Sequence, residues 1–436
     1  MGEVDFKGLS SEIIYMKDLQ EKSGVKMEVI RHGKYKSAVE PFLAQEMSPE
    51  NREQMTVLLN SVWNTIVADI SKSRKLSVAQ LNAIANTLGA RTPELALANK
   101  LVDKVAYEDE YHDMIRAKLK VDKKEKYDIV SITDYAKKAS STVEDYSKDD
   151  IIAVIYAQGE IAGGEGDVNV IGEGSIKRSL QEARDDKDVK AIVLRVNSPG
   201  GSALTSELIW REIEITKKVK PIVVSMGNYA ASGGYYIAAN ADRIFAEPNT
   251  ITGSIGVFGM LPNMNQLGKN IGINAEQVKT HENASGYSVF EPIDENFKGF
   301  VLESIEKTYA TFLKRVADGR KMTTEQVDAI AQGRVWTGVD AHKLGLVDEI
   351  GGLDAAIKYA AKLGKTSSYR TENYPEYEKN FEDLLANFTG MAMFKTKEQL
   401  LKEQLGEEGF QMLKQIKRVK SRKGIQAIMP YEIVIN

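Results

Sequence analysis

A serine near the middle of the chain lies in a setting that suits a nucleophile. Residues 230–236 read Ala-Ala-Ser-Gly-Gly-Tyr-Tyr, and Ser232 stands between a strand-like run and a helix-like run. Its small neighbours allow a sharp turn that exposes the hydroxyl, and the N–H of Gly233 would point to the place where a tetrahedral oxyanion forms. The match to a Gly-x-Ser-x-Gly elbow is partial, because Ala230 stands at the first glycine position. A serine that only caps a helix would give the same pattern.

Two further turns carry groups that such chemistry needs. Residues 197–202 read Asn-Ser-Pro-Gly-Gly-Ser, and Gly200 and Gly201 permit a close backbone approach with N–H groups aimed outward. This turn predicts an oxyanion hole or an edge on which a peptide strand docks, whereas a tight turn at a helix start is the structural alternative. Residues 252–257 read Thr-Gly-Ser-Ile-Gly-Val. Ser254 is a candidate for orienting a base, although a polar turn between strands fits equally well.

A nucleophilic serine needs a base, and the chain has only four histidines. His112, His281 and His342 lie in charged or polar segments. His32 precedes residues 33–42 and is the one imidazole suited to the role, but no His–Asp arrangement stands out. A lysine base is therefore considered, and a lysine acts as a base only where burial or nearby positive charge lowers its pKa.

Lys36 lies among small and apolar residues, in the segment Gly-Lys-Tyr-Lys-Ser-Ala-Val-Glu-Pro-Phe at 33–42. This setting is compatible with burial of the lysine. An internal repeat aligns Lys36 with Tyr287, so the second copy has the serine turn and no matching lysine. The copies look specialised, one for the base and one for the nucleophile. The residues alone do not choose Lys36 over Lys34, and most lysines lie on the surface.

The repeat is visible as four short matches in the same order and at a nearly constant offset, which argues for duplication. The matched pairs are 40–41 with 291–292, 74–77 with 320–323, 82–85 with 328–331, and 101–103 with 346–348. Residues 151–251 have no upstream counterpart, so we expect the first copy to be incomplete and any signal or anchor to belong to a missing amino-terminal part. The predicted organisation is a remnant first copy with the lysine at 1–120, a connector at 121–149, a complete second copy with the serine at 150–353, and a mostly helical tail at 354–436 that ends in a strand-like segment at 433–435.

The second copy alternates strand-like and helix-like segments. Apolar runs at 151–155, 191–196 and 221–226 predict strands of the kind that is buried on both faces. Periodic apolar residues predict helices between them, the first of which buries Ile176, Leu180 and Ala183. Such alternation predicts a parallel sheet of the α/β class, with the glycine-rich turns at the carboxyl ends of strands, where active sites of these sheets lie. In the first copy, apolar residues at helical spacing predict one long helix through Met55, Leu58, Leu59, Val62 and Ile66.

Composition narrows the classes of function. The 436 residues suggest two or three domains, and 58 basic and 62 acidic residues are interspersed, which gives no support to a nucleic-acid partner. The chain has no cysteine, so disulfides, thiolate zinc sites and cysteine nucleophiles are excluded. No apolar run approaches the ~20 residues of a membrane helix. The chain as given is therefore expected to be soluble.

Taken together, the motifs resemble the long, duplicated bacterial form of signal peptide peptidase A, also called protease IV. The resemblance rests on residues 35–42, 197–202, 230–236 and 252–257 and extends over essentially the whole chain. It implies a duplicated Clp/crotonase-like α/β fold with its first copy incomplete. It also implies a Ser/Lys dyad, with Ser232 as nucleophile and Lys36 as base, an oxyanion hole formed by Gly233, Gly200 and Gly201, and a hydrogen bond between Ser254 and the lysine.

The same resemblance implies a role and a setting. Members of the family look like membrane-anchored homotetramers on the periplasmic face of the bacterial inner membrane. They degrade cleaved signal peptides and other unfolded hydrophobic peptides through an acyl-enzyme, without a metal or other cofactor. In this chain, membrane association would depend on the missing amino-terminal segment.

Three other functions compete with a peptidase. A crotonase-type acyl-CoA enzyme shares the fold and the oxyanion turns but uses carboxylates and needs no serine. A non-catalytic oligomeric scaffold of the same fold is the second alternative, against which the intact Ser232 and Lys36 argue. A dinucleotide-binding fold is weaker, because Lys177 follows Gly172 and Gly174 where a third glycine is required.

Overall fold

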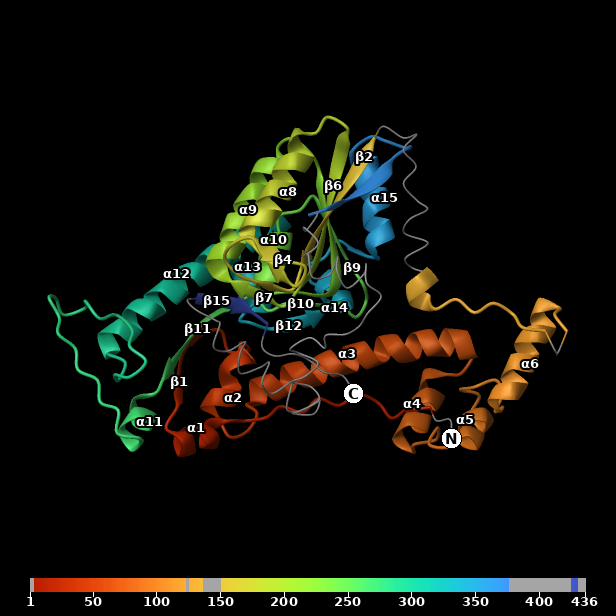
Figure 1. The fold of residues 1–436 in the computed structure, drawn as a ribbon, viewed down its shortest axis with the longest axis horizontal. Coiled ribbons are helices and arrows are strands. Elements are labelled where there is room, and N and C mark those ends of the chain that lie inside the picture. Colours follow the sequence, from red (N-terminus) through yellow and green to blue (C-terminus); the bar gives the residue numbers. More distant parts are fainter. Residues whose placement is uncertain (1–3, 123–124, 136–149, 376–424, 430–436) are drawn as a thin grey trace, which may run out of the picture. The chain divides into compact units, whose positions relative to one another are not determined.

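The computed structural model describes residues 4–122, 125–135, 150–375 and 425–429 (Figure 1). Compactness divides the chain into two units. The first comprises Met1–Glu12, Thr56–Asp149 and Ile433–Asn436, and the second comprises Ile13–Met55 and Asp150–Glu432. The segment around Lys36 thus shares a compact unit with the segment around Ser232. Compactness is a different criterion from sequence repetition, so the predicted domain boundaries stay predictions.

A mainly parallel sheet forms the centre of the second unit. Its strand order is β12-β10-β8-β6-β2-β14, with β9 also paired to β8 and β13 paired to β9. All these pairs are parallel except β10 with β12. The strands are β2 (Ile151–Gln158), β6 (Val189–Ser198), β8 (Ile222–Ala231), β9 (Arg243–Ala246), β10 (Ile251–Gly253), β12 (Val335–Thr337), β13 (Glu349–Ile350) and β14 (Arg370–Tyr374).

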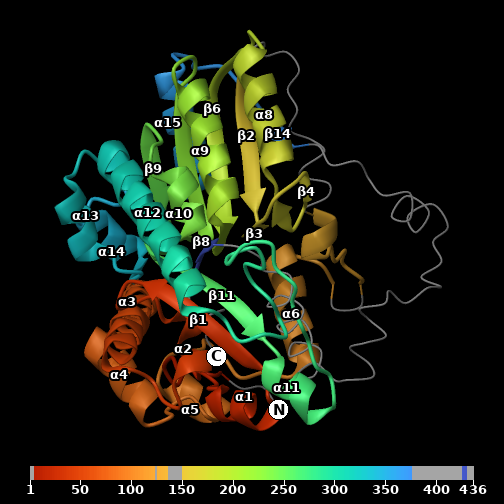
Figure 2. The ribbon, with the colours of Figure 1, turned by 90° about the vertical axis from the view of Figure 1, so that its left-hand side faces the viewer.

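Helices cover both faces of this sheet (Figures 1 and 2). Alternate strand residues point to opposite faces, so Ile192 and Leu194 pack beneath one layer of helices while Ala191 and Val193 pack beneath the other. The first layer contains α8 (Glu173–Asp185), α9 (Ala203–Lys217), α10 (Gly233–Ala238) and α12 (Glu295–Arg320), and the second contains α15 (Leu353–Leu363). The predicted α/β class is confirmed, as are the strands and helices predicted between residues 151 and 238.

A second sheet of short strands belongs to the same unit. Its order is β1-β11-β15-β7-β3-β5-β4. Segments far apart in the sequence therefore lie side by side, because β15 comes from near the carboxyl end and β1 from near the amino end. The strands are β1 (Lys26–His32), β3 (Glu160–Ile161), β4 (Gly166–Asp167), β5 (Val170–Ile171), β7 (Gly200–Ser202), β11 (Val257–Asn263) and β15 (Ile425–Ile428).

Short helices complete the second unit. Some lie in the amino-terminal part of the chain, on either side of β1, and the others lie between strands further along the chain. They are α1 (Lys17–Ser23), the 3₁₀ helix η1 (Ser37–Val39), α2 (Glu40–Leu43), α11 (Asn265–Asn270), α13 (Thr324–Ile330) and α14 (Gly338–Lys343).

The first unit is helical in its described part. The predicted long helix is present as α3 (Pro49–Arg74), which begins in the second unit and ends in the first. It is followed by α4 (Val78–Asn86), α5 (Pro93–Ala98) and α6 (Glu108–Leu119). Val67, Leu81 and Ile84 form a small core, and Phe6 packs on Trp63 with ring centroids 5.3 Å apart.

The predicted tail is described only in part. Its described residues form α15, β14 and β15, while the strand-like segment at 433–435 lies outside the described residues. Among the helices that the structure describes, none has the length and apolar character needed to cross a membrane.

Candidate active site

Ser232 lies at the junction between β8 and α10. Its backbone has φ 55° and ψ −115°, so this residue occupies the left-handed φ region that side-chain-bearing residues rarely adopt. Its N–H donates to the carbonyl of Gly253 at 2.8 Å, which fixes the turn against β10. The hydroxyl makes no capping bond to α10. The capping alternative for Ser232 is therefore excluded, and the hydroxyl is available to another partner.

That partner is Lys36. The Lys36 Nζ lies 2.9 Å from the Ser232 Oγ, and both side chains belong to one chain and one compact unit. The same Nζ donates to the Ser254 Oγ at 3.0 Å and to the Ser254 carbonyl at 3.1 Å. The structure thus brings together three of the residues singled out by sequence: a serine, a lysine and a second hydroxyl.

All three side chains are fully buried, with an exposed fraction of 0%. Burial alone lowers the pKa of Lys36 well below the ordinary lysine value, because the ammonium form loses its hydration. For Ser232 the burial is a correction, since the sequence predicted an exposed hydroxyl. The neighbouring strand β7 is paired with β15, so β15 covers the edge of β7 that solvent would otherwise reach.

The other candidate bases have different surroundings. Lys34 is exposed and its ammonium lies 5.1 Å from the centre of the Tyr35 ring. His32 pairs with Glu306 at 2.8 Å, and its ring stacks on Tyr309 with centroids 4.0 Å apart. Of the two lysines between which the sequence left the choice open, Lys36 is buried and contacts the serine, whereas Lys34 is exposed.

A close-fitting backbone surrounds the stem of Lys36. A Cβ atom on Gly333 would lie 2.6 Å from the Lys36 Cβ, and one on Gly256 would lie 3.2 Å from the Lys36 Cδ. Gly333, at φ 82°, also adopts a conformation that favours glycine. Sequence reasoning missed Gly333. The only signal was a lone Gln-Gly pair at 332–333, which is typical of any turn.

The residues on either side of Lys36 are also held in place. The Tyr35 N–H donates to the Gln332 carbonyl at 2.9 Å, and the Gln54 amide donates to the Tyr35 carbonyl at 3.0 Å and to the Ser37 Oγ at 2.6 Å. Gln54 is buried on α3. Gln54 and Gln332, which hold the Lys36 segment, lie outside the motif at 35–42 and belong to no recognisable motif of their own.

The glycine turn at 197–202 approaches the serine turn closely. A Cβ on Gly200 would lie 2.7 Å from the Gly233 nitrogen, so the short distance requires glycine here. The Gly200 N–H donates to the Ser198 Oγ at 3.1 Å, and Gly201 lies in β7 opposite Ala427. The structure therefore places Gly200, Gly201 and Gly233 together, but the Gly200 N–H is used within its own turn.

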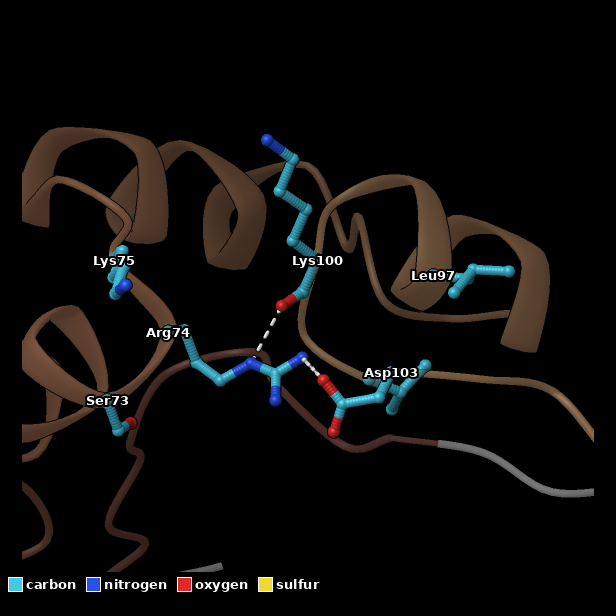
Figure 3. A pocket seen from close by; sticks show the side chains of 7 residues that line it. Ser73, Arg74, Lys75, Leu97, Lys100 and Asp103 are labelled. Atoms are coloured by element: carbon cyan, nitrogen blue, oxygen red, sulfur yellow. Dashed lines mark hydrogen bonds and ion pairs between the residues drawn. The ribbon is translucent and has the colours of Figure 1, made fainter. Parts of the chain in front are cut away.

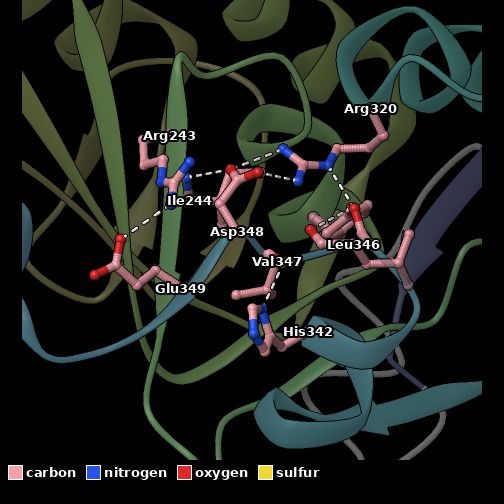
Figure 4. A network of polar contacts seen from close by, with 10 residues as sticks. Arg243, Ile244, Arg320, His342, Leu346, Val347, Asp348 and Glu349 are labelled. Carbon is pink, nitrogen blue, oxygen red and sulfur yellow. Dashed lines mark hydrogen bonds and ion pairs between the residues drawn. The ribbon is translucent and has the colours of Figure 1, made fainter.

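The helix that follows Ser232 is anchored by its two tyrosines. The Tyr235 hydroxyl donates to the Leu346 carbonyl at 2.8 Å, and the Tyr236 hydroxyl donates to Glu207 at 2.5 Å. Leu346 belongs to the polar network drawn in Figure 4, in which Arg320 makes two hydrogen bonds to the Asp348 carboxylate at 2.6 and 3.0 Å. The network fixes the position of α10 and thereby the serine turn.

A separate pocket lies in the first unit (Figure 3). Its polar contacts are internal: Arg74 donates to the Lys100 carbonyl at 2.8 Å and pairs with Asp103 at 3.0 Å. These contacts tie the end of α3 to the segment after α5. The lining residues are Ser73, Arg74, Lys75, Leu97, Lys100, Val102 and Asp103, which include none of the predicted site residues.

Comparison with known proteins identifies a peptidase family. The profile of peptidase family S49 matches residues 1–122 and 214–367. Protease 4 of Haemophilus influenzae is 39% identical over 375 residues, which cover 83% of this chain and 60% of that protein. The chloroplastic serine protease SPPA of Arabidopsis thaliana is 34% identical over 358 residues, which cover 81% of this chain and 53% of that protein. The chain thus spans about three fifths or less of the length of these two relatives.

Among solved structures, a ClpP1 mutant from Listeria monocytogenes matches with a TM-score of 0.32 and 16% identity, over 47% of this chain and 94% of that chain. This similarity is too low to add to the argument.

Proposed function

Because the chain belongs to peptidase family S49, we propose that it is a serine endopeptidase in which Ser232 attacks the peptide carbonyl and Lys36 is the general base. The observation that carries the proposal is the 2.9 Å contact between the Lys36 Nζ and the Ser232 Oγ, made by a fully buried lysine. The family accords with the Clp/crotonase-like α/β class, in which such a site lies beyond the ends of parallel strands.

A neutral lysine is favoured by burial and is compatible with the hydrogen-bond geometry. A neutral amine has two N–H donors and one lone pair. The Ser254 Oγ and the Ser254 carbonyl accept the two N–H groups, so the lone pair is left for the Ser232 hydroxyl. Burial lowers the pKa of Lys36 and so favours this form. Ser254 is accordingly proposed as the residue that orients the base.

The chemical steps follow from this arrangement. As the Ser232 Oγ bonds to the carbonyl carbon, its proton passes to Lys36, which then protonates the leaving amine. Water hydrolyses the resulting acyl-enzyme by the reverse proton path. For the oxyanion we propose the N–H groups of Gly233 and Gly201, since the Gly200 N–H already donates to Ser198.

The second sheet supplies a place for an extended peptide. The position between β11 and β7 has main-chain groups on both sides and is held in this structure by β15. A peptide that took the place of β15 would pair with the glycine turn by strand addition. The adjoining apolar side chains of Met27, Val39, Phe258 and Met260 suit hydrophobic residues. We therefore propose unfolded hydrophobic peptides, including cleaved signal peptides, as substrates.

We propose the assembly and the cellular location of the chain on the basis of its family. The chain would act as part of a homo-oligomer, a tetramer, at the periplasmic face of the bacterial inner membrane, with peptides as its partners. It would need no cofactor, because the lysine and the backbone N–H groups supply the proton transfer and the charge stabilisation that peptide hydrolysis requires.

A direct test combines a probe with a substrate. The chain is treated with a serine-directed acylating probe, and the labelled residue is mapped by mass spectrometry. Hydrolysis of a fluorogenic apolar peptide is measured across pH in parallel. We expect one label on Ser232 and a rate that rises with pH to a plateau as Lys36 loses its proton. A chain that hydrolyses thioesters after Ser232→Ala would instead favour the acyl-CoA enzyme, and a chain that neither reacts nor hydrolyses would favour a scaffold.

A further inference from the structure

Glu40 is a buried acidic residue that the proposed mechanism does not use. It is the first residue of α2 and is 4% exposed. Its Oε2 accepts a hydrogen bond from the Asn51 amide at 2.6 Å and a longer one from the Tyr15 hydroxyl at 3.4 Å. Both donors are neutral groups. Burial of an acidic side chain costs free energy that an apolar side chain of similar size would not, so Glu40 points to a role other than packing.

The repeat provides an internal comparison for this residue. Glu40 aligns with Glu291 in the second copy. Glu291 is partly exposed, and its backbone carbonyl accepts a hydrogen bond from the Asn263 amide at 2.6 Å. The buried environment is therefore found in the copy that carries the lysine, which indicates a use connected with the base.

Two buried amides connect Glu40 to the segment of the base. Asn51 and Gln54 lie about one turn apart on α3, and they are 0% and 1% exposed. The Gln54 Nε2 donates to the Asn51 Oδ1 at 3.1 Å, while the Asn51 amide nitrogen donates to Glu40. The three side chains thus form one continuous line of hydrogen bonds.

The far end of this line holds the backbone on both sides of Lys36. The Gln54 Nε2 also donates to the Tyr35 carbonyl and to the Ser37 Oγ, and the Ser37 hydroxyl donates to the same carbonyl at 3.0 Å. Because Tyr35 and Ser37 flank Lys36, these contacts fix the point from which its side chain extends toward Ser232.

The chemistry of Glu40 sets the direction of the line. A carboxylate only accepts hydrogen bonds, so Asn51 turns its NH₂ group toward Glu40 and its carbonyl oxygen toward Gln54. Gln54 then turns its NH₂ group toward that oxygen, and thereby toward the Tyr35 carbonyl as well. An apolar residue at position 40 would allow the Asn51 amide to rotate by half a turn and to present its NH₂ group to the NH₂ group of Gln54.

From this arrangement we propose that Glu40 is a positioning residue for Lys36 and that it acts through Asn51 and Gln54. The proposal rests on the proposed function of Ser232 and Lys36. Glu40 exchanges no proton with the substrate. It orients the two amides, and the amides hold the backbone around Lys36 so that the Nζ meets the Ser232 hydroxyl.

The test measures hydrolysis of the fluorogenic apolar peptide across pH by the full chain and its variants. Glu40→Leu removes the acceptor and should lower kcat by about 10-fold with KM unchanged. Glu40→Gln restores an acceptor oxygen without the charge and should recover most of that loss, with the rise of the pH–rate profile in place. A rise that moves to lower pH in Glu40→Gln would mean that Glu40 acts on the base by its charge, and would overturn a positioning role.

A double-variant cycle tests whether Glu40 acts through the amides. Gln54→Met should lower kcat, and the double variant Glu40→Leu/Gln54→Met should be no slower than Gln54→Met alone. Losses that multiply would show independent action and overturn the proposal. Asn51→Leu interrupts the same line one step further on and should reproduce the loss in kcat, so the test stands even if Glu40→Leu does not fold.

Tyr15→Phe is the matched control. It removes the other donor to the same Glu40 oxygen, leaves both amides in place and should leave kcat unchanged. A loss as large as that of Glu40→Leu would assign the effect to the packing of α2 and overturn the positioning role. A parent chain that hydrolyses the peptide no faster than Glu40→Leu and Asn51→Leu would overturn this inference and leave the proposed function standing. A parent chain that neither hydrolyses the peptide nor reacts with the probe would overturn both.

Discussion

Two serine turns in the second unit each combine a serine with a pair of glycines, and the two serines have different contacts. Ser202 is the last residue of β7, Ser232 follows β8, and each stands immediately before a helix. Ser202 has φ −58°, and its side chain accepts a hydrogen bond from the Thr205 N–H at 3.3 Å, as an N-cap does. Ser232 has φ 55° and no capping bond, and its hydroxyl lies against Lys36. The difference teaches that backbone conformation and a distant lysine, rather than the local motif, separate a helix cap from a candidate nucleophile.

The largest expected effect is the contrast between alanine variants of the two serines. Ser232→Ala should lower kcat/KM for the apolar peptide by at least about 10⁴, because it removes the oxygen that we propose attacks the peptide carbonyl. Ser202→Ala should lower the free energy of unfolding by about 0.5–2 kcal/mol through loss of the cap. Peptide hydrolysis and urea unfolding measure the two effects. A large rate loss confined to Ser202→Ala would reverse the assignment of the turns.

A second contrast compares two lysines that are two residues apart. Lys36→Met should abolish peptide hydrolysis, whereas Lys34→Met changes an exposed side chain and should leave both rate and stability nearly unchanged. Lys36→Met should also stabilise the fold at pH 7, by about 1–3 kcal/mol, because a buried amine costs free energy.

The sign of this stability effect depends on pH. The pKa of Lys36 is lowered in the folded chain, so between that pKa and about 10.5 the unfolded chain binds a proton that the folded chain does not. Stability of the parent therefore rises as pH increases through this interval. The advantage of Lys36→Met should shrink as the pH approaches the ordinary lysine pKa. Urea unfolding at several pH values tests this, and an advantage that grows with pH would contradict a neutral buried lysine.

A smaller effect is expected at Ser254. Its Oγ accepts a hydrogen bond from Lys36, and an acceptor favours the charged form of the amine. Ser254→Ala should therefore move the rise of the pH–rate profile to lower pH and reduce the plateau by about 10-fold, through poorer orientation of the base. Ser254→Gly removes the same hydroxyl and relieves the left-handed backbone at φ 51°. The two variants should shift the profile alike, whereas a shift in only one would assign the effect to the backbone.

The smallest expected effect comes from Tyr309, which lies behind the loop that encloses Lys36. The Tyr309 hydroxyl accepts hydrogen bonds from the Gln332 backbone and side-chain N–H groups, both at 3.3 Å, and donates to Asp328 at 2.5 Å. Tyr309→Phe removes these three hydrogen bonds and should lower kcat by about 5-fold through looser positioning of the loop, with KM and the pH profile unchanged. A change in KM alone would place Tyr309 on the substrate side instead.

The sequence by itself determined the α/β class and the position of each glycine-rich turn. Continuous apolar runs such as 151–155 predict buried parallel strands because hydrophobic burial acts on every residue of the run. The motif around Ser232 predicted a turn between a strand and a helix, and that turn is present. Local sequence suffices for these features because their cause lies within a few consecutive residues.

Only the tertiary structure decided which distant residues surround the turns. The choice of Lys36 over Lys34 depends on burial beneath Gly333 and Gly256, which lie more than two hundred residues further along the chain. The short strand β15 has no local signal, because its four residues become a strand only through pairing with β7 and β11. The pKa of Lys36, its close contact with Ser232 and the pairing of β15 all depend on residues that are distant in the sequence. These residues come together only when the chain folds.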